Sequence, residues 1–388
     1  MNRIPPSSVS HPRAIVFRYV RAAIALGSIL IMVSAVRWAA RDSRLAANRP
    51  VPLNTTVVRG DQPSQRPSYD LALYEAEVRR MRSGESYYDA AAAELPARGY
   101  PTKSIFNWRQ PLPTALIAAL PRPDDARILL AVVGALILLL GFNLIRCDPE
   151  FVPAAWIWAA LTAVSLMPGI MPRLYYSSEL WAGSLILLSV LLASSGRSAA
   201  AVIVGTAALF LRELALPYCA SAAAIAWRRG RWRELAAWSA GMLLWGSFFA
   251  WHAAQVIGRM PPDATTSRGW LCGGGIDFIL STAQMHFLLV LLPRWFTVLY
   301  FALAAAGFVA CKSELGRRAA TTFAAYVAFF ALVGQPFNQY WGQIWTPLLC
   351  LGVTRSAAIG IRFGGGHLRG LFQAILILRR PRNADHPA

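Results

Sequence analysis

Long apolar runs dominate this chain, and they constrain its fold more than any other feature. Runs of about 20 residues with few charged side chains recur along the sequence, and each is long enough to cross a bilayer as a helix. The mean hydropathy is +0.43. Charged residues make up 15% of the 388 residues, against roughly a quarter in a soluble domain. Backbone polar groups in hydrocarbon must be satisfied within the protein, so these runs predict helices and not barrel strands.

The sequence therefore predicts an all-α, polytopic transmembrane bundle with about ten spans and both termini in the cytoplasm. The expected organisation is a cytoplasmic tail over 1–13, a membrane domain over 14–362 and a basic cytoplasmic tail over 363–388. A long first extracytoplasmic loop, 41–125, lies inside the membrane domain. The expected spans are 18–40, 127–145, 152–170, 179–195, two short helices within 198–227, 235–256, 295–311, 319–335 and 341–358.

Two regions leave the exact number of spans open. Residues 198–227 have basic links at both ends, and their roughly thirty residues are too few for two full spans. We expect two short helices here that meet at a break near Arg212, Glu213 and Pro217. Residues 276–292 are apolar enough to span, but a span here would put the later basic links outside. We therefore expect one helix lying on the outer face.

The formal net charge of +19 does not predict nucleic-acid binding. Most of the positive charge is arginine in short links and near the termini, which is typical of residues held on the cytoplasmic side and near anionic lipid. The five cysteines are scattered without paired spacing, so we infer neither a disulfide framework nor a metal site. Motifs for metal, serine-nucleophile or thiol catalysis are also absent from the sequence.

One long polar segment, Ser68–Pro121, interrupts the apolar runs. Apolar positions at three- and four-residue spacing over Tyr69–Arg82 predict a short amphipathic helix at the membrane surface, ended by Ser83 and Gly84. A second short apolar piece, Leu112–Leu120, is too short to span and is expected at the interface. If the protein is an enzyme, this segment is where we expect its chemistry.

The adjacent charges Arg212 and Glu213 lie inside an apolar stretch, where charge is costly. They are either a self-compensating pair or one wall of a polar cavity, and the sequence leaves both interpretations open. Asp70, at the start of the predicted helix, is favoured there by the helix dipole whether or not it has a catalytic role. Glu75 is expected to be solvated.

The segment carries a pattern of an acid, a tyrosine four positions later, a glutamate three further on, then a methionine and a glycine turn: Asp70, Tyr74, Glu77, Met81 and Gly84. A Tyr-Pro-Thr-Lys stretch at 100–103, Trp-Arg-Gln-Pro-Leu-Pro at 108–113, Glu179 at the start of a later span and Asn-Gln-Tyr-Trp-Gly at 338–342 follow. This layout resembles the C-type (GT-C) membrane glycosyltransferase superfamily. The branch it most resembles contains the lipid A aminoarabinose transferase and polyprenyl-phosphate-mannose mannosyltransferases. Leu71 stands where that branch usually has a second acid.

The resemblance implies an integral-membrane glycosyltransferase of the bacterial cytoplasmic (inner) membrane. Such an enzyme moves a sugar from a polyprenyl-phosphate donor to a glycan, lipid or protein acceptor on the extracytoplasmic face. Asp70 is the expected general base, because a carboxylate can take the proton of an acceptor hydroxyl. Tyr74, Glu77, Glu179 and Glu213 are expected to support it on the acceptor side. The expected phosphate-binding cations are Lys103, Arg109, Arg173 and Arg212.

No cofactor is needed by this scheme, and a divalent metal is not excluded by the sequence. Membrane lipid is the other expected partner. Two further classes of function fit the same layout. One is a transporter or flippase of lipid-linked sugars, which predicts acids and broken helices in paired halves. The other is a non-catalytic membrane assembly protein.

Overall fold

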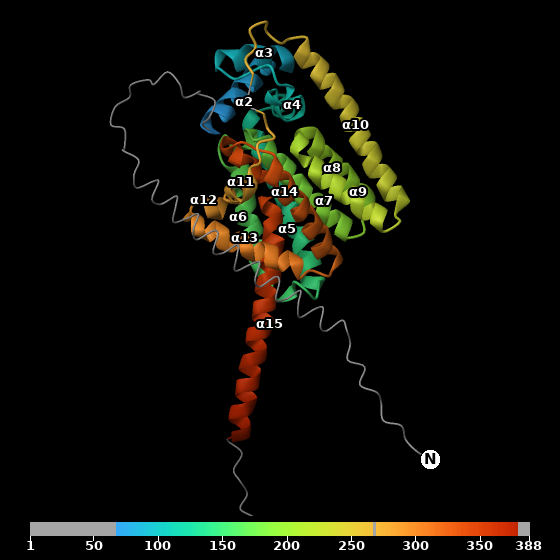
Figure 1. Ribbon diagram of the computed structural model, residues 1–388, viewed down its shortest axis with the longest axis vertical. Helices are drawn as coiled ribbons and strands as arrows, with labels where there is room; N and C mark the ends of the chain where they lie inside the picture. Colours follow the sequence, from blue (N-terminus) through green and yellow to red (C-terminus); the bar gives the residue numbers. More distant parts are fainter. Residues whose placement is uncertain (1–66, 267–268, 379–388) are drawn as a thin grey trace, which may run out of the picture.

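The computed structural model describes residues 67–266 and 269–378, and this part of the chain is all-helical (Figure 1). Its one β feature is an isolated bridge between Leu271 and Val333. The α-helices are α2 (Pro67–Arg82), α3 (Tyr87–Ala97), α4 (Pro111–Ala119), α5 (Ala126–Cys147), α6 (Ala155–Leu166), α7 (Ser178–Ser194), α8 (Ser198–Leu211), α9 (Leu216–Arg228), α10 (Trp232–Ile257), α11 (Gly275–Ala283), α12 (Phe287–Val290), α13 (Arg294–Val309), α14 (Glu314–Leu332) and α15 (Thr346–Leu378). Short 3₁₀ turns link them, including η7 (Glu213–Ala215) and η8 (Pro336–Ile344).

Two helical stretches of the described chain are long and apolar enough to cross a membrane, Pro123–Cys147 with 25 residues and Val152–Ile170 with 19. A third candidate is the pair Pro336–Ile344 and Thr346–Phe363, whose axes are bent by 68°. Helix α5 exposes a row of large apolar side chains, Ile128, Val132, Leu136 and Leu139. Such a row is suited to lipid contact, so the fold is that of a membrane-associated helical protein.

The predicted count of ten spans stays a prediction. The expected first span, 18–40, lies outside the described residues. Helices α7, α8 and α13 are apolar but shorter than a full span. Several helices nevertheless agree with expected segments within a few residues, because α7, α10 and α13 begin and end close to 179–195, 235–256 and 295–311.

Of the two ambiguous regions, 198–227 agrees with its prediction and 276–292 does not. Residues 198–227 form two short helices, α8 and α9, as predicted. The break occurs where Arg212 has an extended backbone (φ −155°, ψ 121°) and Pro217 occupies the first turn of α9. The single helix expected over 276–292 is wrong, because α11 ends at Ala283 and α12 begins at Phe287. His286 starts the second piece, since its Nδ1 accepts a hydrogen bond from the Leu288 N–H at 3.3 Å.

Helices α2, α3 and α4 of the polar segment pack together at one end of the bundle (Figure 1). They share a small apolar core that includes Val78, Tyr87 and Trp108 and that continues into the bundle through Trp181 and Leu211. A larger core fills the bundle itself. Helix α10 is also tied to the polar segment, because the Tyr88 hydroxyl lies 2.9 Å from Nδ1 of buried His252. The polar segment is therefore a packed part of the fold.

Candidate active site

Helix α2 presents the predicted acid, tyrosine and glutamate on one face. Asp70, Tyr74 and Glu77 are separated by four and three residues, so they lie within one narrow stripe of the helix. Tyr74 and Glu77 are buried, and Asp70 is partly exposed at the first turn. Gly84 follows the helix with a φ of +101°, a conformation that glycine adopts without strain, so the chain turns directly into α3.

Asp70 is held by a tyrosine from the loop after α3. The Tyr100 hydroxyl donates to Asp70 Oδ1 at 2.6 Å. Burial raises the pKa of Asp70 above its usual value, while the nearby Arg109 and the hydrogen bond from Tyr100 partly oppose that rise. A carboxylate with a raised pKa is a stronger base than an ordinary aspartate, which suits proton abstraction from a hydroxyl.

Arg109 lies between two tyrosines that come from distant parts of the chain. Its Nε donates to the Tyr74 hydroxyl at 2.8 Å, and its Nη2 donates to the Tyr340 hydroxyl at 2.5 Å. The Tyr87 hydroxyl holds the Arg109 backbone carbonyl at 2.5 Å. Among the described residues Arg109 forms no ion pair with a carboxylate. Its positive charge is thus oriented by neutral groups and is not neutralised by direct contact.

Arg212 is the most deeply buried cation of the site. Its Nε forms an ion pair with Glu179 Oε1 at 2.8 Å, and its Nη1 bonds to Glu213. Its Nη2 is buried without a hydrogen-bond partner in the described structure. The interpretation of Arg212 and Glu213 as a self-compensating pair therefore agrees with the structure. The two residues also border a cavity, described below, but that cavity is largely apolar and not the polar one of the second interpretation.

Gln110 joins this cluster to α10, and the sequence did not mark it as a site residue. The Gln110 Nε2 donates to Glu213 Oε2 at 3.1 Å and to the Leu209 carbonyl at 3.2 Å. Its Oε1 accepts from the Trp245 indole at 3.1 Å. Buried Gln110 thus fixes the orientation of Glu213 and the position of Trp245. Its sequence signal is its place directly after Arg109 within the Trp-Arg-Gln-Pro-Leu-Pro stretch at 108–113.

A cavity of about 710 Å³ opens beside the two arginines. Arg109, Arg212 and Glu213 line one part of it, and the remaining walls are apolar or aromatic. These walls come from the break between α8 and α9, from α10, from the C-terminal end of α14, from η8, and from the chain around 106 and 270. The apolar and backbone lining consists of Phe106, Leu214, Leu216, Pro217, Ala220, Trp245, Phe249, Gly269, Trp270, Leu271, Phe329, Val333 and Trp341.

Two predicted phosphate-binding cations are not part of this cluster. Arg173 forms an ion pair at 2.6 Å with Glu75, and both side chains are partly exposed. Glu75 lies about 100° or more around α2 from the Asp70 face, since each helical residue turns about 100°. Glu75 is thus a partly exposed surface residue, in line with its expected solvated position, and it also pairs with Arg173. The Lys103 side chain is exposed, and neither Lys103 nor Arg173 lines the cavity.

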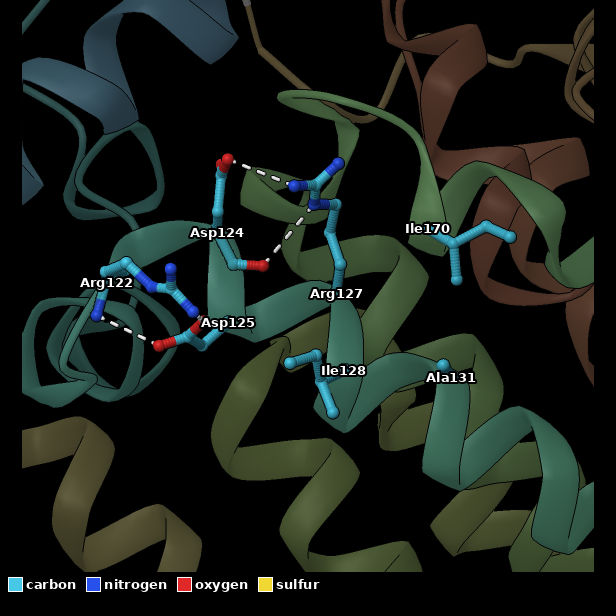
Figure 2. Close-up of a pocket in the computed structure, with 7 residues that line it drawn as sticks. All are labelled: Arg122, Asp124, Asp125, Arg127, Ile128, Ala131 and Ile170. Atoms are coloured by element: carbon cyan, nitrogen blue, oxygen red, sulfur yellow. Dashed lines mark hydrogen bonds and ion pairs between the residues drawn. The ribbon is translucent and has the colours of Figure 1, made fainter.

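A second hollow, of about 470 Å³, lies at the start of α5 (Figure 2). Its charged side chains pair with one another, Arg122 with Asp125 at 3.2 Å and Arg127 with Asp124 at 3.1 Å. Asp124 also accepts a hydrogen bond from the Tyr175 hydroxyl at 2.7 Å. With these charges paired inside the hollow, the cavity beside Arg212 is the better candidate site. The hollow is lined by Arg122, Asp124, Asp125, Arg127, Ile128, Ala131 and Ile170.

Comparison with known proteins adds no match to this geometry: no protein-family model, no curated protein and no solved structure matches the chain. In the part of the chain that the structure describes, no three His, Cys, Asp or Glu side chains come together as metal ligands would. The cofactor expectation and the resemblance to GT-C enzymes stay predictions.

Proposed function

We propose that this chain is an integral-membrane glycosyltransferase that uses a polyprenyl-phosphate sugar as donor, with Asp70 as general base. The observation that carries the proposal is the cavity in which a largely apolar chamber meets two arginines. A polyprenyl phosphate has the matching chemistry, because an isoprenoid tail requires apolar walls and a phosphate requires cationic donors.

The unpartnered nitrogen of Arg212 supports an anionic ligand. Arginine only donates hydrogen bonds, and a buried donor without an acceptor is energetically costly. In the described structure Nη2 of Arg212 has no acceptor, and Arg109 lines the same cavity without a carboxylate in contact. A phosphate oxygen would satisfy the Arg212 donor and would meet the charge of Arg109.

Arg109 also connects the cavity with the candidate base. Its Nε contacts Tyr74, which follows Asp70 by one turn of α2, and its positive charge lowers the pKa of Asp70. A phosphate bound at Arg109 would therefore bring the anomeric carbon of its sugar toward Asp70. Such placement of the reacting groups lowers the barrier by making the transfer effectively unimolecular.

In the proposed step, Asp70 takes the proton of an acceptor hydroxyl while that oxygen bonds to the anomeric carbon. The bond from the anomeric carbon to the phosphate oxygen breaks, and its electron pair stays on the phosphate. Arg109 and Arg212 stabilise the charge of the leaving polyprenyl phosphate. The configuration of the anomeric carbon inverts, and Asp70 returns its proton to water.

A binding measurement tests the ligand class. Purified protein in nanodiscs is titrated with a fluorescent polyprenyl phosphate, and the matched control is the same polyprenol without phosphate. We expect the phosphate to bind at least tenfold more tightly, because each charge-assisted contact contributes about 1.5–3 kcal/mol. Equal affinity for the two lipids would remove the basis of the proposal.

A transfer assay separates the enzyme from a flippase or an assembly protein, either of which could bind the same lipid. Membranes containing the chain are supplied with tritium-labelled polyprenyl-phosphate hexoses and pentoses. Transfer into a polyprenyl-free product is expected, and Asp70→Asn should reduce its rate by about 10²–10⁴-fold. An Asp70→Asn protein that inserts normally and retains full transfer would exclude the general-base role.

A further inference from the structure

Tyr340 stands between the candidate base and the candidate phosphate-binding cation. Its hydroxyl accepts a hydrogen bond from Arg109 Nη2 at 2.5 Å, and the guanidinium carbon lies 5.8 Å from its ring centroid. The same hydroxyl also lies close enough to the Asp70 carboxylate to act as a donor that lowers the pKa of Asp70. Tyr340 belongs to η8, so this contact joins the last part of the bundle to the polar segment.

The position of η8 is fixed by close backbone packing on both sides. A Cβ added to Gly342 would collide with the backbone of Thr282 in α11, and one added to Gly183 in α7 would collide with the carbonyl of Gln343. The Ser177 hydroxyl also donates to Gln343 Oε1 at 2.7 Å. Because only glycine permits these approaches, the segment that carries Tyr340 is packed firmly against α7 and α11.

The donor and acceptor capacities of the arginine and tyrosine side chains determine which way the Tyr340 hydroxyl proton points. Arginine can only donate, so the Tyr340 oxygen must accept from Arg109, and the one hydroxyl proton is left to donate elsewhere. A hydroxyl that accepts from a cation is also a stronger donor, because linked hydrogen bonds polarise one another. The partner available to it is the Asp70 carboxylate.

We propose that Tyr340 is a positioning residue that holds Asp70 and Arg109 in one hydrogen-bonded unit and so couples the basicity of Asp70 to the phosphate-binding cation. This proposal rests on the proposed function for its catalytic meaning, although the coupling itself can be measured without a substrate. Tyr340 touches neither the transferred proton nor the phosphate in this role. It acts through the two residues that do.

Three tyrosine-to-phenylalanine variants separate the effect of Tyr340 on Asp70 from its effect on Arg109. Tyr100→Phe removes a donor to Asp70 alone, and Tyr74→Phe removes an acceptor from Arg109 alone. Tyr340→Phe removes both kinds of contact. The primary readout is the pH dependence of carbodiimide labelling of Asp70, followed by mass spectrometry. Labelling requires the protonated carboxyl, so its pH midpoint reports the pKa of Asp70 and needs no substrate.

For Tyr340→Phe and for Tyr100→Phe we expect the labelling midpoint to rise by about one pH unit, because each loses a hydrogen bond to the carboxylate. Tyr74→Phe should leave the midpoint close to the wild-type value. The affinity for fluorescent polyprenyl phosphate should fall about tenfold in Tyr340→Phe and in Tyr74→Phe, because each loosens Arg109. It should change little in Tyr100→Phe.

Replacing Tyr340 by 3-fluorotyrosine gives an opposite test that keeps the ring and the hydroxyl. The more acidic phenol is a stronger donor, so the midpoint of Asp70 labelling should fall. A Tyr340→Phe midpoint equal to wild type, with Tyr100→Phe shifted, would overturn the coupling. A shifted midpoint in a protein that does not bind polyprenyl phosphate would keep the coupling and refute the proposed function, so the two failures are distinguishable.

Discussion

Two arginines, Arg212 and Arg318, are buried in nearly the same chemical surroundings at opposite ends of α9 and α14. Arg212 meets Glu179 and Glu213, and Arg318 meets Glu314 at 2.6 Å and Glu234 at 3.4 Å. Each side chain is almost fully buried, and each has an Nη2 atom without a hydrogen-bond partner in the described structure. By residue type and burial alone, the two would be judged equivalent.

They differ in the space beside them. Arg212 lines the cavity of about 710 Å³, and its guanidinium carbon lies 5.9 Å from the ring centroid of Trp341. Arg318 does not line that cavity, and its partner Glu314 also pairs with Arg229 and with Arg317. A buried arginine between two glutamates therefore serves first to link helices through its ion pairs. Of these two arginines, only Arg212 also borders a cavity large enough for a ligand.

The largest expected effect comes from Arg212→Gln, with Arg318→Gln as the matched control. Arg212→Gln leaves buried Glu179 without its cation, so it should lower the free energy of unfolding by about 3–5 kcal/mol. Arg318→Gln should lower it by less, because Glu314 keeps Arg229 and Arg317, and Glu234 keeps Arg231. Only Arg212→Gln should also reduce the affinity for polyprenyl phosphate, by roughly 10- to 100-fold. Unfolding in nanodiscs and lipid titration of the folded fraction measure the two effects separately.

The proposed difference between the two arginines would be wrong if the folded Arg318→Gln protein lost lipid binding as strongly as the folded Arg212→Gln protein does. The loss would then reflect general loosening of the bundle. Conversely, unchanged binding in Arg212→Gln would show that the cavity does not use this cation.

A second expected effect is on the pH dependence of stability. It concerns Glu77, a buried carboxyl that forms no ion pair among the described residues. Burial raises the pKa of Glu77 to about 8, with Arg109 and Arg98 opposing the rise only in part. The folded protein thus keeps a proton that the unfolded chain releases near pH 4.5. Stability should be fullest below that pH and should fall as pH rises through the window up to about 8.

Glu77→Gln tests this pH dependence of stability, because glutamine keeps the shape of the neutral acid. The variant should lose the fall in stability between about pH 4.5 and 8, which thermal unfolding across that range measures. Glu314→Gln serves as the contrast. Hydrogen bonds and charge from Arg229 and Arg318 lower the pKa of Glu314 despite burial, so a paired carboxyl is stabilised in its charged form. An unchanged pH dependence in Glu77→Gln would show that Glu77 is ionised in the folded state.

The smallest effect is expected for Arg173→Gln. Its pair with Glu75 is partly exposed, and exposed ion pairs contribute about 0–1 kcal/mol. Both the unfolding free energy and the affinity for polyprenyl phosphate should stay near wild type. A large loss of binding would return Arg173 to the set of phosphate-binding residues that the sequence predicted.

Much of the local structure was predictable. The three- and four-residue spacing of apolar positions along Tyr69–Arg82 predicted α2. The charge pair and Pro217 predicted the break between α8 and α9. These features depend on near neighbours in sequence, where helix periodicity and proline geometry act directly.

The partners of the site residues were not predictable in the same way. Glu179 was expected on the acceptor side, yet it is the ion-pair partner of Arg212. Gln110 and Tyr100 proved to be well-placed hydrogen-bonding residues, although no periodicity distinguishes them. Lys103 and Arg173 have the right charge and lie near the polar segment, but they do not reach the cavity. Residue type is therefore a poor guide to which cation serves a site.

The sequence by itself determined that this is a helical, membrane-associated chain with one long polar segment, because apolar runs and helix periodicity are local properties. Only the tertiary structure decided which cations and acids meet. Arg109 and Tyr340 are 231 positions apart in the sequence, and their side chains meet at 2.5 Å. They meet because η8 packs closely against α7 at Gly183 and against α11 through its own Gly342. Such meetings depend on how helices pack, and the pattern within any one helix does not specify that packing.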